Sequence, residues 1–89
     1  MYEVILTRRA QREYDKLPAV ELSRIDRTLN LLKKEPRPEG NKKLYGNIYR
    51  IRNGDWRIIY AIFDKDKGVI IGKIAKRGED TYNGVKNLF

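Results

Sequence analysis

Apolar and polar residues alternate most clearly over residues 49–58, on either side of Asn53-Gly54, and an apolar run continues from Ile58 to Phe63. Successive side chains of a strand point to opposite faces, so every second position shares a face. An Asn-Gly pair between two such segments is typical of a two-residue hairpin turn. The pattern predicts two strands, Ile48–Arg52 and Asp55–Phe63. One face of this hairpin is almost wholly apolar and is expected to be buried, and it carries Tyr49, Ile51, Trp56, Ile58, Tyr60 and Ile62.

The other face of the predicted hairpin carries arginines close to the turn. With Asn53-Gly54 as the two turn residues, Arg50 would lie opposite Arg57. Two like charges directly across a strand pair cost stability unless an anion lies between them. Arginines near a hairpin turn are more often a plain solvated surface, where an exposed ion pair contributes only about 0 to 1 kcal/mol. The pattern is thus a first indication of an anion site, which the rest of the chain must support.

The N-terminal part of the chain has a different period. Residues Tyr2–Thr7 are predicted to form a first strand, whose place in the sheet the sequence leaves open. Apolar residues then recur every three or four positions, as in helices that bury one side. One helix follows Thr7, which can cap it, and stops at Pro18. A second helix is predicted from Val20 to Lys34. The two apolar stripes are Ala10, Tyr14 and Leu17 in the first helix, and Leu22, Ile25, Leu29 and Leu32 in the second.

The remaining segments complete a single sheet. Residues 36–47 are rich in Pro, Gly and Asn and are expected to form the longest loop. After the hairpin, Asp64–Gly68 is a polar turn and Val69–Ala75 is a final strand. The order strand, two helices and a three-strand meander predicts an α+β fold, in which helices cover one face of a mainly antiparallel sheet. We expect residues 1–89 to be one domain.

Composition narrows the possible functions. The chain has a net charge of +8, with no histidine and no cysteine. A basic surface favours phosphate backbones, an acidic protein partner or an anionic membrane. The membrane ranks last, because the sequence has neither a long basic amphipathic helix nor an apolar run that could span a bilayer. We therefore expect a cytoplasmic protein.

The missing residue types exclude several kinds of chemistry. Without cysteine there is no disulfide framework and no thiolate metal site, and no metal or cofactor is expected. Without histidine, the usual general base near neutral pH is absent. Any acid–base step must therefore use Lys, Tyr, Asp or Glu.

Basic residues from several segments are expected to converge beside the hairpin. Either register of the last hairpin places Ala75 or Lys76 opposite Arg57. Guanidinium groups bind phosphate oxygens bidentately and stabilise charge in a transition state, and RNA carries its own nucleophile, the 2′-hydroxyl. These residues alone indicate a polyanion binder and leave catalysis open. The predicted phosphodiester site contains Arg50, Arg52, Arg57, Lys76, Arg77 and Tyr82, with the loop residues Lys42 and Lys43 as further RNA contacts.

The chain resembles the RelE/ParE superfamily of toxin–antitoxin toxins over nearly its whole length. The resemblance is most specific in the K-L-x-G loop, in the Y-R-I-R-x-G-D-W-R-x-I-Y hairpin and in the Lys76-Arg77 pair. It implies a fold of the microbial-ribonuclease type and a metal-independent, ribosome-dependent endoribonuclease that cuts mRNA in the A site and inhibits translation. It also implies a cognate acidic antitoxin that wraps the toxin in a hetero-oligomer.

The resemblance also assigns roles to individual residues. Arg50 and Arg52 stand where RelE-type toxins have two basic residues on the second strand. Arg57 stands at the phosphate-clamping arginine of the third strand, and Arg77 at the arginine after the last strand. Tyr82 matches the C-terminal tyrosine that orients the substrate or stacks on it, although the spacing from Arg77 is about one residue shorter. By resemblance, all five are candidate catalytic residues.

One departure from RelE concerns the general base. RelE has lysines where this chain has Arg50 and Arg52, and arginine stays protonated because its ordinary pKa lies above roughly 12. Activation of the 2′-hydroxyl must then come from Tyr82, Lys76, a loop lysine or the ribosome. We expect slow or no cleavage of free RNA.

Two other functions remain open from the sequence. The ParE branch shares the fold and poisons DNA gyrase without cutting RNA, but it lacks this set of basic residues. Because this chain has them, its sequence favours the RelE branch. The chain could also bind RNA or antitoxin without catalysing cleavage. Replacing Arg57 or Arg77 by alanine would abolish the toxicity of a nuclease and barely affect a gyrase poison.

Overall fold

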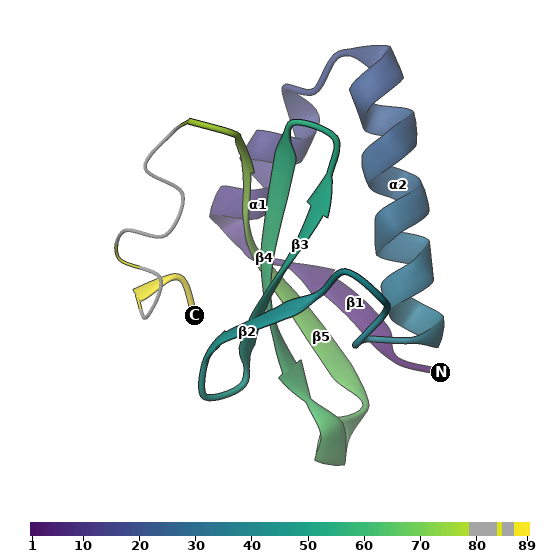
Figure 1. Cartoon of the computed structure of the whole chain (residues 1–89), viewed down its shortest axis with the longest axis vertical. Helices are drawn as coiled ribbons and strands as arrows, with labels where there is room; N and C mark the ends of the chain where they lie inside the picture. Colours follow the sequence, from purple (N-terminus) through teal and green to yellow (C-terminus); the bar gives the residue numbers. More distant parts are fainter. Residues whose placement is uncertain (79–83, 85–86) are drawn as a thin grey trace.

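Five strands and two helices form the fold, and the structure, a computed structural model, describes residues 1–78, 84 and 87–89. The sheet has the order β1-β5-β4-β3-β2 (Figure 1). Strand β1 runs parallel to β5, and every other neighbouring pair is antiparallel. The elements are β1 (Glu3–Leu6), α1 (Arg8–Asp15), α2 (Ala19–Lys34), β2 (Lys42–Tyr45), β3 (Ile48–Asn53), β4 (Trp56–Phe63), a 3₁₀ turn (Asp64–Asp66) and β5 (Gly68–Lys76).

Both helices form where the apolar period predicts them. The Thr7 hydroxyl accepts a hydrogen bond from the Ala10 N–H at 3.2 Å and so caps α1. The buried residues of α2 include Ile25, Leu29 and Leu32, as the predicted stripe requires. No helix in the described part of the chain is both long and apolar enough to cross a bilayer.

The predicted apolar face of the hairpin forms the main core. Ile51, Ile58, Tyr60 and Ile62 are buried in one cluster with residues of both helices, and Tyr49 and Trp56 pack against its edge. Each fully buried isoleucine contributes about 1.5–3 kcal/mol through removal of apolar surface from water. This inner face of the sheet is therefore closed. A smaller cluster of Ile48, Ile59 and Ala61, with Leu44 and Leu88, lies on the outer face.

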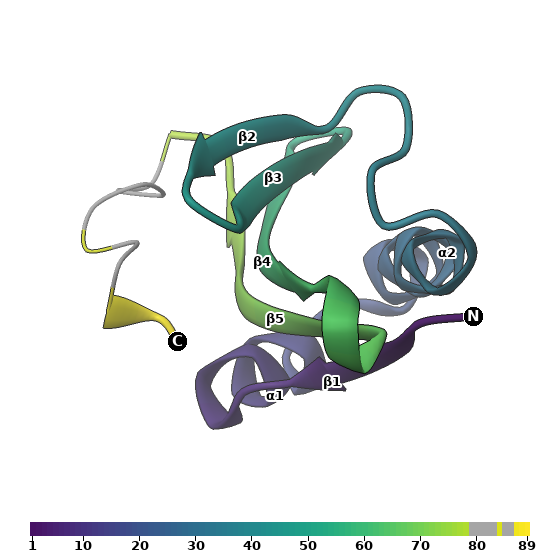
Figure 2. The ribbon, with the colours of Figure 1, turned by 90° about the horizontal axis from the view of Figure 1, so that it is seen from below.

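The outer face is the side of the sheet turned away from the helices. Figure 2 shows α2 and the C-terminal residues on opposite sides of the curved sheet. Leu88 packs against the outer cluster of Ile48, Ile59 and Ala61. A Cβ atom at Gly72 would lie 2.6 Å from the Phe89 ring and 3.0 Å from Leu88 Cβ. Only glycine at this position leaves room for the last two residues of the chain.

The turn of the central hairpin differs from the prediction by one position. Asn53 lies opposite Trp56, so the two turn residues are Gly54 and Asp55. Gly54 has φ +60° and Asp55 does not have a positive φ, the combination found in type II′ turns. Arg52 therefore lies opposite Arg57, and the predicted pairing of Arg50 with Arg57 is wrong. The partners shift by two residues, an even number, so every side chain keeps its predicted face.

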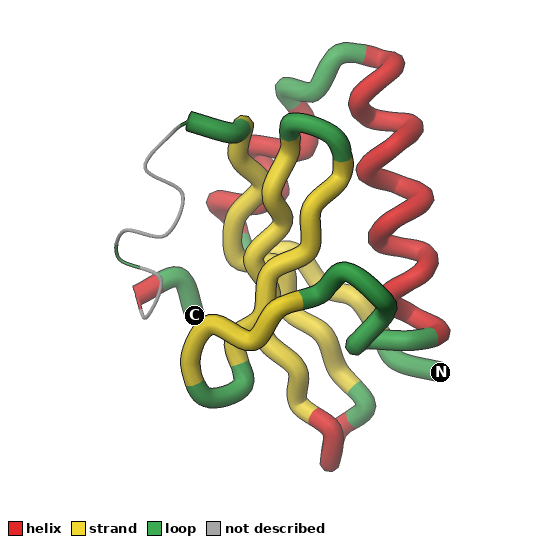
Figure 3. Tube along the Cα trace, in the orientation of Figure 1, coloured by secondary structure: helices red, strands yellow, loops and turns green. Residues whose placement is uncertain are grey.

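The predicted loop of residues 36–47 contains an additional strand. Strand β2 pairs with β3 at the edge of the sheet, so the meander has four strands rather than three (Figure 3). A register shift between Lys43 and Tyr45 marks a bulge in this short strand.

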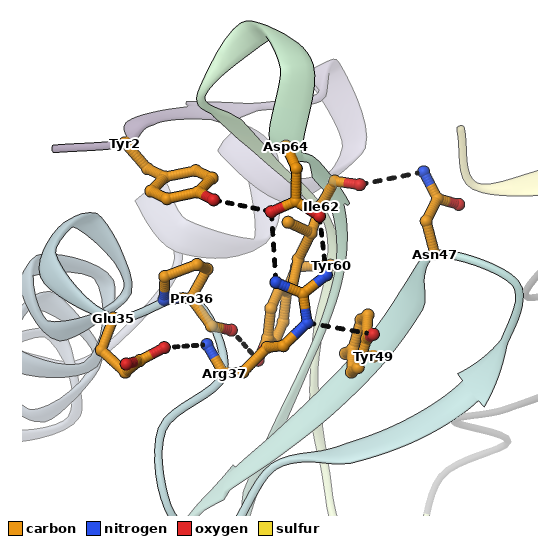
Figure 4. A network of polar contacts seen from close by, with 9 residues as sticks. All are labelled: Tyr2, Glu35, Pro36, Arg37, Asn47, Tyr49, Tyr60, Ile62 and Asp64. Carbon is orange, nitrogen blue, oxygen red and sulfur yellow. Dashed lines mark hydrogen bonds and ion pairs between the residues drawn. The ribbon is translucent and has the colours of Figure 1, made fainter.

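A polar network anchors the segment that leads into β2 (Figure 4). The Arg37 guanidinium donates two hydrogen bonds to the Asp64 carboxylate, at 3.2 and 2.9 Å, and one to the Tyr49 hydroxyl at 3.2 Å. The Tyr60 hydroxyl donates to the Pro36 carbonyl at 2.8 Å. Burial raises the pKa of Tyr60 to about 12, so this hydroxyl keeps its proton. The network fixes the end of the sheet opposite the arginine-bearing hairpin turn.

Candidate nucleic-acid interface

Two transverse rows of residues carry the cations of the outer face. Neighbouring strands lie about 4.8 Å apart, so partner residues of one row are close neighbours. The strand register brings together cations from β2, β3, β4 and β5 on one surface. The first row is Lys42, Arg50, Ile59 and Lys73, and the second is Arg52, Arg57 and Ala75.

Arg57 is the most constrained arginine of these rows. Its side chain is buried, at 9% exposure. Nη1 donates to the Gly54 carbonyl at 3.4 Å and to the Trp56 carbonyl at 3.3 Å, both beside the hairpin turn. A guanidinium has five N–H donors, so the backbone contacts orient the group and leave further donors for an anion.

Arg57 and Arg52 form a like-charged pair next to the turn of the hairpin. They lie directly opposite each other on adjacent strands, as Lys42 and Arg50 do in the neighbouring row. None of these four cations forms an ion pair with a described residue. Like charges across a strand pair destabilise it, so an anion placed between them relieves the repulsion. The charges on this part of the outer face would therefore favour a bound anion.

Two of the sequence-predicted lysines, Lys76 and Lys43, lie opposite residues of the inner face. Lys76 lies opposite Trp56, and its Nζ is 5.9 Å from the centroid of the Trp56 ring, at the edge of the inner cluster. The expected register with Ala75 opposite Arg57 is present, but it places the Lys76 ammonium on the side of Trp56, so the expectation that Lys76 joins the arginines is wrong. Lys43 lies opposite Tyr49, a residue of the inner face. Tyr82 lies outside the described residues.

Arg77 lies beside the hairpin turn. Its backbone N–H donates to the Asp55 carbonyl at 2.5 Å, which extends the β4–β5 ladder by one position. Arg77 is exposed. It is two positions from Ala75, a residue of the second row, so the alternation of the strand places it on the same face. The strand register thus brings this candidate to the edge of the cationic surface.

Lys73 is a member of the first row that the sequence analysis missed. It is only 6% exposed and lies opposite Ile59. The sequence did contain a signal, because Lys73 is the one charged residue inside an apolar strand. It is two positions from Ala75 and therefore lies on the same face as Ala75. A lysine inside an otherwise apolar strand is easily assigned to the core and so missed as a site residue.

A separate cleft lies on the helical side of the molecule, away from the rows. It has a volume of about 260 Å³ and lies between β1, α1 and α2. The Tyr14 hydroxyl donates to the Asp26 carboxylate at 2.5 Å, which raises the pKa of Tyr14. No group of three or more His, Cys, Asp or Glu side chains that could hold a metal ion is found among the described residues. The cleft is lined by Val4, Leu6, Gln11, Tyr14, Asp26, Leu29, Asn30 and Lys33.

Comparison with known proteins gives consistent matches. A family model described as the ParE toxin of type II toxin–antitoxin systems, parDE, matches residues 4–81. A protein of Methanocaldococcus jannaschii named RelE1 is 30% identical over 81 residues, which cover 85% of this chain and 90% of that protein.

Two solved structures have the same fold at sequence identities near 30%. The archaeal RelE–RelB complex from Pyrococcus horikoshii matches with a TM-score of 0.80 and 32% identity, over 88% of this chain and 97% of that one. The toxin–antitoxin complex RelBE2 from Mycobacterium tuberculosis matches with a TM-score of 0.75 and 29% identity, over 85% of this chain and 98% of that one.

Proposed function

The chain belongs to the ParE toxin family of type II toxin–antitoxin systems, within the RelE/ParE superfamily, and on this premise we propose that it is an endoribonuclease that cleaves mRNA on the ribosome. The observation that carries the proposal is the Arg52–Arg57 pair on the outer face, next to Lys42 and Arg50. Four cations without a described ion-pair partner suit a phosphodiester backbone.

In the proposed reaction the substrate supplies its own nucleophile. The 2′-hydroxyl loses its proton as the 2′-oxygen forms a bond to the adjacent phosphorus, the bond from phosphorus to the 5′-oxygen breaks, and the 5′-oxygen takes up a proton. A 2′,3′-cyclic phosphate and a 5′-hydroxyl result. Arg57, oriented by two backbone carbonyls, would stabilise the charge on the phosphorane. Arg52 and Arg50 would hold the flanking phosphates.

The reaction would depend on the ribosome for geometry. Guanidinium groups stabilise charge but do not accept a proton at neutral pH. The 2′-hydroxyl proton must therefore pass to another group, for which Tyr82, a lysine or a ribosomal group are the candidates. In-line alignment of the 2′-oxygen with the leaving oxygen, imposed by the ribosome, would supply much of the rate.

We also propose an acidic antitoxin as the partner of this chain in a hetero-oligomer. The two similar structures from P. horikoshii and M. tuberculosis are toxin–antitoxin complexes. A net charge of +8 favours an acidic partner chain. A toxin that acts on translating ribosomes would work in the cytoplasm.

Primer extension on an mRNA in a reconstituted translation system tests the proposal, with naked mRNA alongside. We expect new 5′ ends only in the ribosome-bound sample. Arg57→Ala should reduce their rate of appearance by about 100-fold, the usual effect of removing one transition-state donor. Arg27→Ala is the matched control, since Arg27 is an exposed arginine of α2, outside the cationic rows. Equal effects of the two variants would contradict the assignment of the site.

The matching family model is described as the ParE toxin, and the resemblance to the ParE branch implies one alternative, inhibition of DNA gyrase. Absence of cleavage in both samples, together with inhibition in a gyrase supercoiling assay that Arg57→Ala leaves unchanged, would establish this alternative instead.

A further inference from the structure

Asn53 occupies the last position of β3, directly after Arg52, and its side chain points away from the cationic rows. Its side-chain amide donates to the Thr28 hydroxyl at 2.6 Å and to the Arg24 carbonyl at 2.9 Å, both on α2. One amide group thus connects the tip of the central hairpin to the second helix.

The α2 side of this contact is itself ordered by packing. Thr28 is buried, and its hydroxyl donates to the Arg24 carbonyl at 3.4 Å. Nη1 of Arg24 lies 3.3 Å from the place that a Cβ atom at Gly54 would occupy. One turn of α2 therefore touches two consecutive residues of the hairpin tip, Asn53 through its amide and Gly54 through the Arg24 guanidinium.

The tip of β3 needs this support because the sheet gives it little. Strand β2 pairs with β3 only as far as Arg50, so Arg52 and Asn53 have a strand neighbour on one side alone. The tip of β3 is therefore an edge of the sheet, whereas Trp56 and Arg57 of β4 are also paired with β5 on their other side. The hairpin tip also carries the like-charged Arg52–Arg57 pair, whose repulsion acts to separate the two strands.

We propose that Asn53 is a positioning residue, which fixes the hairpin tip against α2 so that Arg52 and Arg57 present one preorganised geometry to a phosphate. The identity of the phosphate ligand as RNA rests on the proposed function. Preorganisation matters because donors that are already aimed at the ligand require no reorganisation when it binds.

The sequence offers a matched control for this residue. Asn47 lies at the other end of the same hairpin, and its side-chain amide donates to the Ile62 carbonyl at 3.2 Å. Asn47→Ala therefore also removes an amide-to-carbonyl hydrogen bond from the hairpin, but far from the arginine pair.

The test compares Asn53→Ala with Asn47→Ala, each alone and combined with Arg57→Ala. The readouts are the affinity for a fluorescent single-stranded RNA oligonucleotide and the kcat and KM of cleavage in the ribosomal assay. We expect Asn53→Ala to weaken RNA binding and lower kcat by about tenfold, with Asn47→Ala within twofold of wild type. In the Arg57→Ala background, Asn53→Ala should have a clearly smaller further effect, because the Arg52–Arg57 pair that it positions is already broken.

Full additivity of Asn53→Ala and Arg57→Ala, or equal losses in Asn53→Ala and Asn47→Ala, would overturn the proposal. If Asn53→Ala does not fold by circular dichroism, Thr28→Val removes the hydroxyl acceptor from the helix side and should show the same non-additivity. Absence of cleavage by the wild-type protein would reject the nuclease function, whereas the RNA-binding comparison would still decide the role of Asn53.

Discussion

At the scale of single residues, the Asp64 carboxylate shows how one charge can connect distant parts of the chain. It accepts hydrogen bonds from Arg37 and, at 2.6 Å, from the Tyr2 hydroxyl, so it links the N-terminus, the segment before β2 and the β4–β5 turn. These hydrogen bonds, that from Arg37 first, lower the pKa of Asp64 from 3.8 to about 2. Both partners of the ion pair are substantially exposed, at 41% and 53%, so solvent screens the attraction.

The lowered pKa of Asp64 predicts a pH-dependent contribution to stability. A carboxyl group with a depressed folded-state pKa stabilises the fold above its unfolded value, and this stabilisation is lost as pH falls through the folded value. For Asp64 the loss falls between about pH 4 and pH 2. We expect Asp64→Asn to lower the Tm at pH 6, and the difference from wild type to shrink from pH 4 to pH 2.

Thermal unfolding followed by circular dichroism at several pH values measures this effect. Asp66→Asn is the control, because Asp66 lies in the same 3₁₀ turn without a described hydrogen bond or ion pair. An Asp64→Asn difference that stays constant from pH 6 to pH 2 would rule out the carboxylate as its source.

The sequence predicted which face each hairpin residue occupies, but not its cross-strand partner. The face follows from the strict alternation of strand side chains, which a shift by two residues preserves. The cross-strand partner depends on which residues form the turn. Asn53 is not one of them, and its side chain donates hydrogen bonds to Thr28 and Arg24 on α2. That contact joins residues far apart in the sequence, which local patterns do not record.

At the scale of elements, β4 is the centre of the fold. Ile58, Ile59, Tyr60, Ala61 and Ile62 are each at most 2% exposed, since helices cover one face and the outer cluster covers part of the other. A strand covered on both faces has a continuous apolar run, as this one does. The arginine that begins the run, Arg57, is therefore carried by the most rigidly packed strand of the sheet.

This packing predicts a large loss of stability when a β4 side chain is shortened. Ile58→Ala leaves a cavity in the main core and should lower the free energy of unfolding by about 2–5 kcal/mol. Ile5→Ala, at a side chain that is 50% exposed on the edge strand β1, should change it by about 0.5 kcal/mol or less. Urea denaturation at equilibrium measures both, and a loss below about 1 kcal/mol for Ile58→Ala would contradict the central position of β4.

The elements differ in how well the sequence predicted them. Helix α2 was predicted to within one residue and the start of α1 was predicted at Thr7, because the apolar period, the Thr7 cap and the prolines are local signals, but α1 ends at Asp15, before Leu17 and Pro18. Strand β2 was missed, because Lys42–Tyr45 has too few apolar residues to mark a strand and is ordered by pairing with β3. The place of β1 beside β5 was not predicted either, because this parallel pairing joins residues far apart in the sequence.

At the scale of the whole molecule, the charge is concentrated and largely unneutralised. The chain has 20 Lys and Arg against 12 Asp and Glu. In the described part, the side chains form two ion pairs, Arg9–Glu13 and Arg37–Asp64, and neither lies in the cationic rows. A phosphate backbone bound to Lys42, Arg50, Arg52 and Arg57 would therefore displace counterions from RNA without first breaking an ion pair of these four side chains.

Counterion release makes the number of phosphate contacts measurable. For single-stranded RNA, the logarithm of the binding constant should fall with the logarithm of the salt concentration with a slope of about −0.7 per contact. Contacts from Lys42, Arg50, Arg52 and Arg57 give a slope of about −2.8, and Arg52→Ala should bring it to about −2.1. Arg27→Ala, on α2, should leave the slope unchanged. Fluorescence anisotropy with an oligouridine between 50 and 300 mM KCl is a suitable measurement. Equal slopes for the two variants would mean that RNA responds to the net charge of the protein as a whole. The outer face would then not be the RNA interface.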